Sequence, residues 1–336
     1  MRRRDFLSGV GAAGVMPLVA GSAAAQKRPN ADLAPQTRSG HASLNFEFPG
    51  LAIGTADYVE GPTGCTVFGF GRRVMVETDI RGGASGTIGD YPTCDAICLA
   101  GGSAMGLEAA TGVTAELFER RGESGRSGNI PLVMGAVIYD FGVRPNWIYP
   151  DAALGRAALR AAAPGTFPLG RVGAGSSATV GKAWNPKYRG EPAGQGGAFG
   201  TLGATRIAVF TVVNALGAIV DRTGKVVRGN RDESGHRASI AEGIASKTGE
   251  PPQGNTTLTV VVTNQAFERS ALRQIGRQVH AAMARALQPF HGRADGDVLY
   301  VASTSQLHNP KVSDFTLAAA AGELAWDAVL SCFAPG

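Results

Sequence analysis

The sequence has few cysteines and histidines, and their spacing is not that of metal ligands. They are Cys65, Cys94, Cys98, Cys332, His41, His236, His280, His291 and His308. Three residues separate Cys94 from Cys98, whereas redox and zinc motifs have two residues between their cysteines. The Gly-x-Ser-x-Gly motif is also missing. These absences argue against a zinc site, a redox-active cysteine pair and a histidine-dependent serine hydrolase.

After residue 25, runs of basic residues and long hydrophobic runs are missing as well. After residue 25 no apolar stretch is long enough to span a bilayer. The formal net charge of +5 falls to +3 without residues 1–25, which contain three arginines and one aspartate. No cluster of Lys and Arg with interleaved aromatic residues remains, which argues against nucleic acid as a partner. The 336 residues, 44% of them hydrophobic, have an ordinary globular composition.

The first 25 residues are typical of an export signal. Arg3–Leu7 is a twin-arginine pattern, a short apolar stretch follows over Val10–Ala20, and Ala23–Ala25 offers a cleavage site. We therefore expect removal of the signal peptide, a periplasmic location and no stable membrane anchor. Because the twin-arginine route carries folded proteins, we expect the four cysteines to be buried as free thiols, although an oxidising compartment would permit two disulfides.

A single domain of mixed helices and strands is predicted for residues 43–336, after a flexible polar segment at 26–42. Helical spacing of apolar residues predicts helices, and apolar runs rich in β-forming residues predict buried strands. The expected helices cover 103–121, 151–163, 272–287 and a closing stretch to about 330. The expected strands cover 130–141, 206–213, 258–263 and 298–302. Residues 223–255 are polar, and a structureless loop of this length indicates processing or function.

The junction between Asn255 and Thr256 is the most informative feature of the sequence. A polar loop with Pro251, Pro252 and Gly254 ends there, and an apolar β-type run begins. If the backbone is cut before Thr256, one residue carries both a nucleophilic Oγ and a free α-amine. Such an amine has a reference pKa of about 7.7–8.0, so part of it is neutral at pH 7 and can accept the hydroxyl proton. The alternatives are an ordinary strand start and an N-glycosylation sequon.

Two other charged motifs are candidates for the same site. The stretch from Gly175 to Lys182 resembles a phosphate-binding loop, but its glycines are five residues apart instead of four and Ala183 replaces the magnesium-binding hydroxyl. Nucleotide binding is therefore rejected. Lys182 is either a solvated charge or, near a site, a group with a lowered pKa. Asp295 and Asp297 place two carboxylates on one turn, which alone is typical of a turn or a weak cation site.

Several motifs, in one order along the chain, resemble those of a known enzyme family. They are Glu60–Gly64, Ala96–Gly102, Gly106–Ala109, Ala136–Phe141, Tyr149–Gly155, Val220–Arg222, Val227–Asn230, Gly254–Thr257, Gln288–His291 and Asp295–Asp297. The chain is similar to the DmpA-type family of N-terminal-nucleophile peptidases, and most closely to its nylon-oligomer branch, the 6-aminohexanoate-oligomer endo-hydrolases. The likeness extends from about residue 46 to about residue 330.

The resemblance implies an α+β fold, an αββα-type layered sandwich of the DmpA-like N-terminal-nucleophile kind. It also implies self-cleavage between Asn255 and Thr256 into an α chain, residues 26–255, and a β chain, residues 256–336. The two chains would stay together, and homo-oligomers of these αβ heterodimers would form. Thr256 would be the nucleophile, with Lys182 close to it.

The resemblance assigns further residues to the same site, position by position. Asn214 and Tyr139 would face the developing oxyanion, because amide and phenol donors stabilise a tetrahedral intermediate. Asp295 and Asp297 would orient the hydroxyl and the amine of the nucleophile. Paired acids at these two positions are similar to the nylon-oligomer branch, whereas aminopeptidase relatives carry Ser and Glu there.

These assignments predict hydrolysis of amide bonds in small oligoamides or peptides through an ester acyl-enzyme, without metal or cofactor. Two alternatives stay open. One is an aminopeptidase of the same family that acts on free-amine peptides, including those with β- or D-residues. The other is an exported binding protein that keeps the fold without catalysis. The enzyme of the nylon-oligomer branch is cytoplasmic, whereas this sequence begins with an export signal. The natural substrate therefore stays open too.

Overall fold

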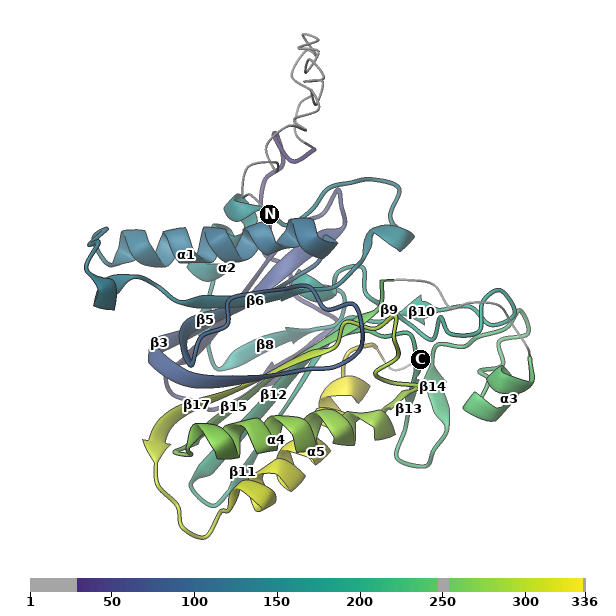
Figure 1. The fold of residues 1–336 in the computed structure, drawn as a ribbon. Helices are drawn as coiled ribbons and strands as arrows, with labels where there is room; N and C mark the ends of the chain where they lie inside the picture. Colours follow the sequence, from purple (N-terminus) through teal and green to yellow (C-terminus); the bar gives the residue numbers. More distant parts are fainter. Residues whose placement is uncertain (1–28, 247–253, 335–336) are drawn as a thin grey trace, which may run out of the picture.

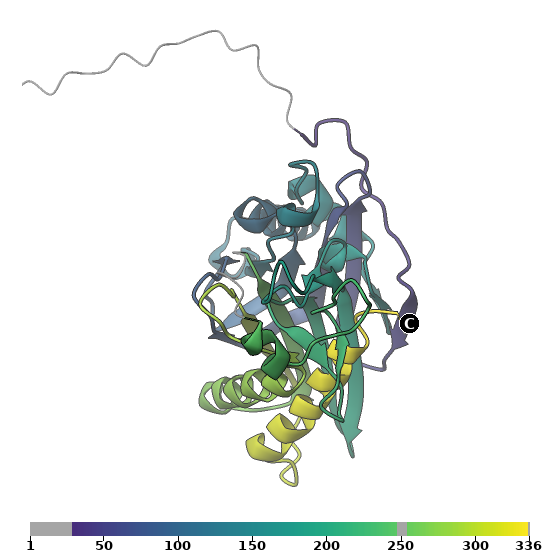
Figure 2. The same ribbon diagram turned by 90° about the vertical axis from the view of Figure 1, so that its right-hand side faces the viewer.

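The structure is a computed structural model that describes residues 29–246 and 254–334, so the expected signal peptide lies outside the described residues. Its elements form four layers (Figure 1). Helices α1 (Glu108–Arg120) and α2 (Ala152–Arg160) cover one face of the strands, and α4 (Arg269–Ala282) and α5 (Asp314–Leu330) cover the other. Figure 2 shows the two helix pairs at opposite ends of the molecule. This arrangement confirms the expected αββα sandwich.

The two strand layers are one hydrogen-bonded sheet that continues from one layer to the other through β3 (Thr63–Ile80). The first half of β3 pairs with β2 (Leu51–Tyr58) and its second half pairs with β17 (Val298–Leu307). Its pairing with β5 has a register irregularity between Gly69 and Val74. The strand order is β11-β12-β15-β17-β3-β5-β6-β4, with β2 and β7 beside it. The remaining strands are β4 (Thr87–Ile88), β5 (Thr93–Ala100), β6 (Val133–Val137), β7 (Ala163–Pro164), β11 (Gln195–Leu202), β12 (Thr205–Asn214) and β15 (Thr256–Gln265).

Three hydrophobic cores lie between the layers, and alternate side chains of the central strands contribute to two of them. Val260 of β15 packs in the inner core between the strand layers, whereas Val261 packs under α4 and α5. The rings of Phe68, Phe167 and Phe210 fill the inner core, with the Phe167 and Phe210 centroids 4.8 Å apart. The third core lies under α1 and α2. All ten residues of β15 are buried, although only four of them are apolar and the others are Thr, Asn and Gln.

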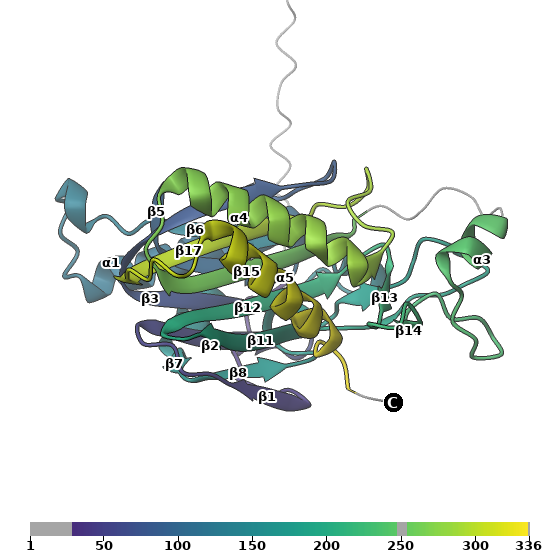
Figure 3. The same cartoon turned by 90° about the horizontal axis from the view of Figure 1, so that it is seen from below.

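The four long helices lie where the sequence predicted them, although several boundaries differ by a few residues. Helix α2 begins after Asp151, whose carboxylate accepts a hydrogen bond from the Leu154 N–H at 3.1 Å. Helix α4 buries the predicted apolar face and lies beside α5 over the strands (Figure 3). It ends at Ala282 rather than near 287, because a 3₁₀ turn follows it and Leu287 pairs in β16 (Leu287–Gln288).

The polar region that was expected to be a structureless loop contains regular elements up to residue 246. β14 (Val226–Arg228) pairs with β13 (Ala218–Val220), which also pairs with β16. Helix α3 (Ile240–Ala245) starts with a capping box between Ser239 and Glu242, a local signal that the charged composition concealed. The other short strands are β1 (Ala42–Asn45), β8 (Thr166–Leu169), β9 (Thr179–Val180) and β10 (Glu191–Pro192). Short 3₁₀ turns cover Ser103–Leu107, Ser127–Asn129, Phe141–Val143, Gly173–Gly175 and Met283–Arg285.

The segment 26–42, expected to be flexible, is described from residue 29 onward and makes specific contacts there. Gln36 and Asp57 exchange backbone hydrogen bonds of 2.9 and 2.8 Å. The guanidinium of Arg38 donates to the Asp57 carboxylate at 3.0 Å. Polar side chains of this segment therefore find partners on β2.

All four cysteines are buried and free, which confirms the expectation of buried free thiols. Burial raises the pKa of the Cys332 thiol to about 12, so this thiol is unreactive at neutral pH. In residues 29–246 and 254–334, no helix is both long and apolar enough to cross a membrane.

Candidate active site

Thr256 is the first residue of β15, where the chain enters the sheet from the long polar region. It pairs with Asn214, the last residue of the neighbouring strand β12. Thr256 is only 4% exposed, and its Oγ donates a hydrogen bond to the carbonyl oxygen of Asn255 at 2.6 Å. The hydroxyl therefore lies against the carbonyl group of the peptide bond that the sequence marks for cleavage.

A second donor reaches the same carbonyl oxygen, and the sequence alone did not reveal it. The backbone N–H of Gly296 donates to the Asn255 oxygen at 2.7 Å. A Cβ at position 296 would lie 2.5 Å from the carbonyl oxygen of Ala84 and 2.9 Å from the Thr256 Oγ, so only glycine lets this turn come so close. A fixed N–H at this oxygen is the kind of donor that a tetrahedral oxyanion needs. The signal in the sequence is the glycine between two aspartates.

A Gly296→Ala variant should cut itself about a hundredfold more slowly than the wild type, the typical cost of losing one oxyanion donor. The methyl group would push the turn away from the Asn255 carbonyl and against the nucleophile. The measurement is the rate at which the full-length band disappears on a denaturing gel. Gly125→Ala is the matched control, because a Cβ there meets nothing within 4 Å. If both variants are cleaved at the wild-type rate, Gly296 has no role in self-cleavage.

The two predicted carboxylates hold the backbone around Thr256. Asp297 Oδ1 accepts a hydrogen bond from the Thr257 N–H at 2.7 Å. The Asp295 carboxylate accepts from two backbone N–H groups at 2.7 and 3.3 Å, and burial, reinforced by the charge of Asp297, raises its pKa to about 6. Within the described residues no hydrogen bond joins either carboxylate to Thr256. The amine they are expected to orient is still an amide in the uncut chain, so that role stays a prediction.

His291 fixes the second carboxylate, a contact that the sequence did not indicate. Its Nδ1 lies 2.9 Å from Oδ2 of Asp297, and its Nε2 lies 3.3 Å from the backbone oxygen of His280. His280 in turn contacts the Asp79 carboxylate at 2.8 Å. Asp297 is thus held from two sides, by His291 and by the Thr257 N–H. The motif Gln288–His291 carried the only sequence signal for this residue.

Lys182 and Asn214 lie together, as the sequence resemblance implied. The Lys182 Nζ donates to the backbone oxygen and to Oδ1 of Asn214, both at 3.2 Å. Gly181 before it has a left-handed φ of 71°, and a Cβ there would lie 2.3 Å from the Asn230 nitrogen. Burial lowers the pKa of Lys182 to about 7, against the opposing effect of the Asp295 charge. An amine with this pKa can accept or donate a proton near neutral pH.

The side-chain amide of Asn214 is occupied in the uncut chain. Its Nδ2 donates to the backbone oxygens of Tyr139 at 2.9 Å and of Gly254 at 3.5 Å. It therefore lies one peptide unit away from the Asn255 carbonyl that Gly296 contacts. An oxyanion role for Asn214 toward an added substrate stays a prediction.

Tyr139 packs on the chain just before the cleavage point. Gly254 has a left-handed φ of 83°, and a Cβ there would lie 2.4 Å from the Tyr139 ring, so glycine is required for this contact. Tyr139 as a whole is 39% exposed. Tyr139 lies between β6 and the 3₁₀ turn at Phe141–Val143. An oxyanion role for its phenol stays a prediction.

Two cavities meet at this contact. One has a volume of about 350 Å³, and its lining includes Lys182, Asn214 and Asn255. The other has a volume of about 450 Å³, and its lining includes Thr256. Tyr139 and Gly254 line both cavities. Asn255 and Thr256, the two residues of the expected cleavage site, therefore line different cavities.

Comparison with known sequences points to one family. Peptidase family S58 matches residues 48–334. The 6-aminohexanoate-oligomer endohydrolase of Paenarthrobacter ureafaciens is 45% identical over 318 residues, which cover 89% of this chain and 88% of that protein. The residues matched by the family, 48–334, span all the site residues described above.

Comparison with solved structures agrees on the fold. A protein from Pyrococcus horikoshii aligns with a TM-score of 0.65 at 14% identity, covering 89% of this chain and 88% of that chain. The L-aminopeptidase D-Ala-esterase/amidase from Ochrobactrum anthropi, described as a variant of the Ntn hydrolase fold, aligns with a TM-score of 0.62 at 15% identity, with the same coverage. At these identities the likeness shows the fold alone, and it agrees with the four layers.

Proposed function

The chain belongs to peptidase family S58 and is a hydrolase of amide bonds, and from this we propose that it is a self-processing amidase of linear oligoamides with Thr256 as its N-terminal nucleophile. One observation carries the proposal: the Thr256 hydroxyl and the Gly296 N–H meet on the carbonyl oxygen of Asn255. A nucleophile and an oxyanion donor are thus assembled on one internal peptide bond.

Self-cleavage follows from this geometry as an N-to-O acyl shift. The Thr256 Oγ attacks the carbonyl carbon of Asn255, and the Gly296 N–H stabilises the oxyanion. The C–N bond to Thr256 then breaks, and the hydroxyl proton passes to the departing nitrogen. Water hydrolyses the resulting ester, which leaves a carboxylate on Asn255 and a free hydroxyl and amine on Thr256.

Substrate hydrolysis uses the same oxygen on an added amide. The hydroxyl proton of Thr256 passes to its own amine or to Lys182, and the leaving amine of the substrate takes up a proton when the C–N bond breaks. The acyl ester on Oγ is then hydrolysed by water. Asp297, held by His291 and by the Thr257 N–H, fixes the first residues of β15 during both steps.

The substrate class is inferred from the relatives and from the space at the site. The 45% identical relative is named an endohydrolase of 6-aminohexanoate oligomers, and the two residues of the marked bond line different cavities here. An internal amide bond of a linear chain fits such a site. The aminopeptidase alternative is supported by a relative from Mycobacterium bovis that is 36% identical over 251 residues and is named an uncharacterized aminopeptidase. The solved aminopeptidase structures show only the fold.

Two measurements test the proposal. Mass spectrometry of freshly purified protein should detect a fragment of residues 256–336 with an N-terminal threonine. The processed protein should then cleave linear 6-aminohexanoate oligomers whose amino end is blocked. Hydrolysis of free-amine oligomers alone would favour the aminopeptidase, and an intact chain without activity would favour the binding protein.

The pH dependence of hydrolysis should reveal the buried amine. Burial lowers the pKa of Lys182 to about 7, so its neutral, proton-accepting form predominates above that pH. The free α-amine of Thr256, with a reference pKa of about 7.7–8.0, titrates in the same direction. We therefore expect the initial rate of the processed enzyme to fall about tenfold or more between about pH 8 and about pH 6. A rate that is level across this range would contradict a role for either amine as base.

We propose further that the protein is exported to the periplasm by the twin-arginine route, without a membrane anchor, and assembles as a homo-oligomer of αβ units. The support for export is the pattern Arg3–Leu7 and the small residues before Gln26. Replacing Arg3 and Arg4 by lysine should keep the protein in the cytoplasm of a bacterial host, as judged by cell fractionation. Sedimentation velocity of the processed protein tests the assembly.

A further inference from the structure

A row of aromatic side chains, exposed at both ends and half-buried in the middle, leads away from the site. We define the aromatic strip as Tyr139, Phe141 and Trp147. The ring centroids of Tyr139 and Phe141 are 6.0 Å apart, and those of Phe141 and Trp147 are 5.5 Å apart. Trp147 is 72% exposed, more than any other large hydrophobic residue in the described part of the chain. Exposed apolar surface of this kind is typical of an interaction site.

The strip is continuous with the cavity beside the marked peptide bond. Tyr139, Gly142 and Val143 line the cavity of about 350 Å³ that also contains Lys182. Val143 is 54% exposed, so the apolar wall of the cavity passes directly into the open surface. A chain that leaves the cavity on this side would run over Phe141 and Trp147.

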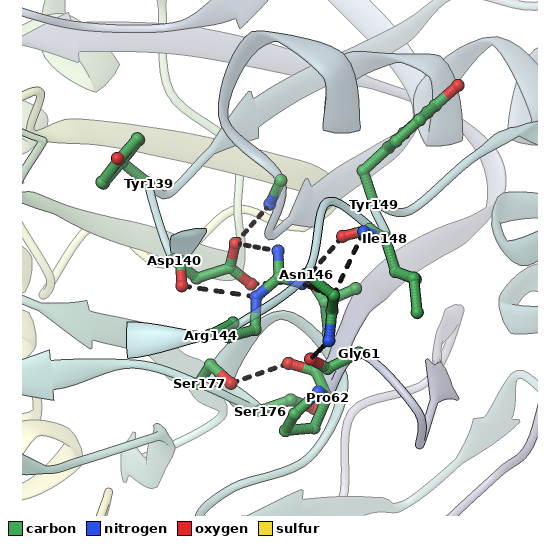
Figure 4. A network of polar contacts seen from close by, with 12 residues as sticks. Gly61, Pro62, Tyr139, Asp140, Arg144, Asn146, Ile148, Tyr149, Ser176 and Ser177 are labelled. Atoms are coloured by element: carbon green, nitrogen blue, oxygen red, sulfur yellow. Dashed lines mark hydrogen bonds and ion pairs between the residues drawn. The ribbon is translucent and has the colours of Figure 1, made fainter. Parts of the chain in front are cut away.

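A buried ion pair keeps the loop of the aromatic strip in place (Figure 4). Asp140 and Arg144 are each 1% exposed in their side chains and lie 2.7 Å apart. Thr63 donates to the other oxygen of the Asp140 carboxylate at 2.6 Å. Breaking such a pair would leave an uncompensated buried charge. The ion pair therefore stabilises the observed conformation of the loop.

The same arginine fixes the part of the loop that carries Trp147. Its Nη1 donates to Asn146 Oδ1 at 3.0 Å and to the backbone oxygen of Ile148 at 2.8 Å. Asn146 is anchored in turn on the backbone of Gly61 at 2.8 Å. The Arg144 guanidinium also lies over the Phe141 ring, 4.6 Å from its centroid. Trp147 is therefore presented by a preorganised loop.

We propose that the aromatic strip is an extended binding subsite for the apolar methylene segments of a long linear oligoamide. The inference rests on the proposed function and names which surface selects chain length. Methylene groups have no hydrogen bonds to offer, so burial against aromatic rings is the interaction that recognises them. A short substrate with one amide bond at Thr256 does not extend to Trp147, whereas a longer one does.

The test compares Trp147→Ala with the wild type on two 6-aminohexanoate oligomers, one short and one several units longer. For the long oligomer we expect KM to rise about tenfold, equivalent to about 1.4 kcal/mol, with kcat nearly unchanged. For the short oligomer both constants should stay as in the wild type. Trp147→Phe should restore most of the affinity. Phe315→Ala, at a residue 70% exposed on α5, is the matched control and should change neither.

Each other outcome has a definite meaning. Equal losses on both oligomers, or no loss on the long one, would overturn the inference while leaving the proposed function intact. If the variant instead changes the sedimentation coefficient together with activity on both lengths, the strip is a contact between copies of this chain, and the inference is wrong. A wild-type enzyme that cleaves neither oligomer would refute the proposed function itself.

Discussion

A Thr256→Ala variant is expected to remain a single uncut chain and to lose hydrolysis by about four orders of magnitude or more, because nucleophile and base belong to one residue. The hydroxyl that contacts the Asn255 carbonyl is removed, so the acyl shift has no attacking atom. A denaturing gel and the release of new amines from an oligoamide measure the two losses.

The controls for this variant are available in the same strand. Thr256→Ser keeps a hydroxyl and should still be cut and active. Thr257→Val is the matched control, because the Thr257 hydroxyl is buried without a hydrogen-bond partner among the described residues and valine has nearly the same shape. A fragment of residues 256–336 from the alanine variant would show that another group makes the cut.

The second large effect is expected for Lys182→Met, which keeps the length of the side chain and removes its amine. We expect hydrolysis to fall about 10²- to 10⁴-fold, the usual contribution of a general acid or base. The methionine cannot donate to the two Asn214 oxygens that the lysine contacts, so Asn214 should also be less well fixed. The pH dependence of the remaining rate should then follow the Thr256 α-amine alone, with a reference pKa of about 7.7–8.0.

Lys187→Met is the control for charge, since Lys187 is exposed in the same region and contacts only the Tyr188 ring among the described residues. The readouts are kcat and KM across pH, measured on material that has already been processed. If Lys182→Met retains the wild-type rate and pH profile, the α-amine of Thr256 alone is the base. Self-cleavage followed on a gel separates the two reactions, because the acyl shift can deliver its proton directly to the departing nitrogen.

Several parts of the fold could be predicted because they depend on residues close together in the sequence. Helix α2 begins directly after Asp151, where the helix was expected to start, and the apolar residues of α4 repeat with helical spacing. Local signals also account for the misses. The 3₁₀ turn after Ala282 continues the apolar spacing of α4, so the sequence predicted a longer helix. The capping box at Ser239 was hidden in a charged segment.

The site could be predicted only in part, for a similar reason. The resemblance brought Lys182, Asn214 and the two aspartates together with Thr256, and the structure places all of them around the start of β15. It could not show what each side chain contacts in the uncut chain. Asp297 is bonded to the Thr257 N–H and to His291, an arrangement that depends on the backbone of two separate segments.

The sequence by itself determined the family, the layered fold and the position of the junction at Thr256. Hydrophobic periodicity and the order of the motifs are properties of the sequence that do not depend on tertiary contacts. Only the tertiary structure decided that the Gly296 N–H and the Thr256 hydroxyl share one carbonyl oxygen, and that an exposed tryptophan adjoins the cavity. Backbone donors carry no side-chain signature, and contacts between distant segments form only when the strands align in register.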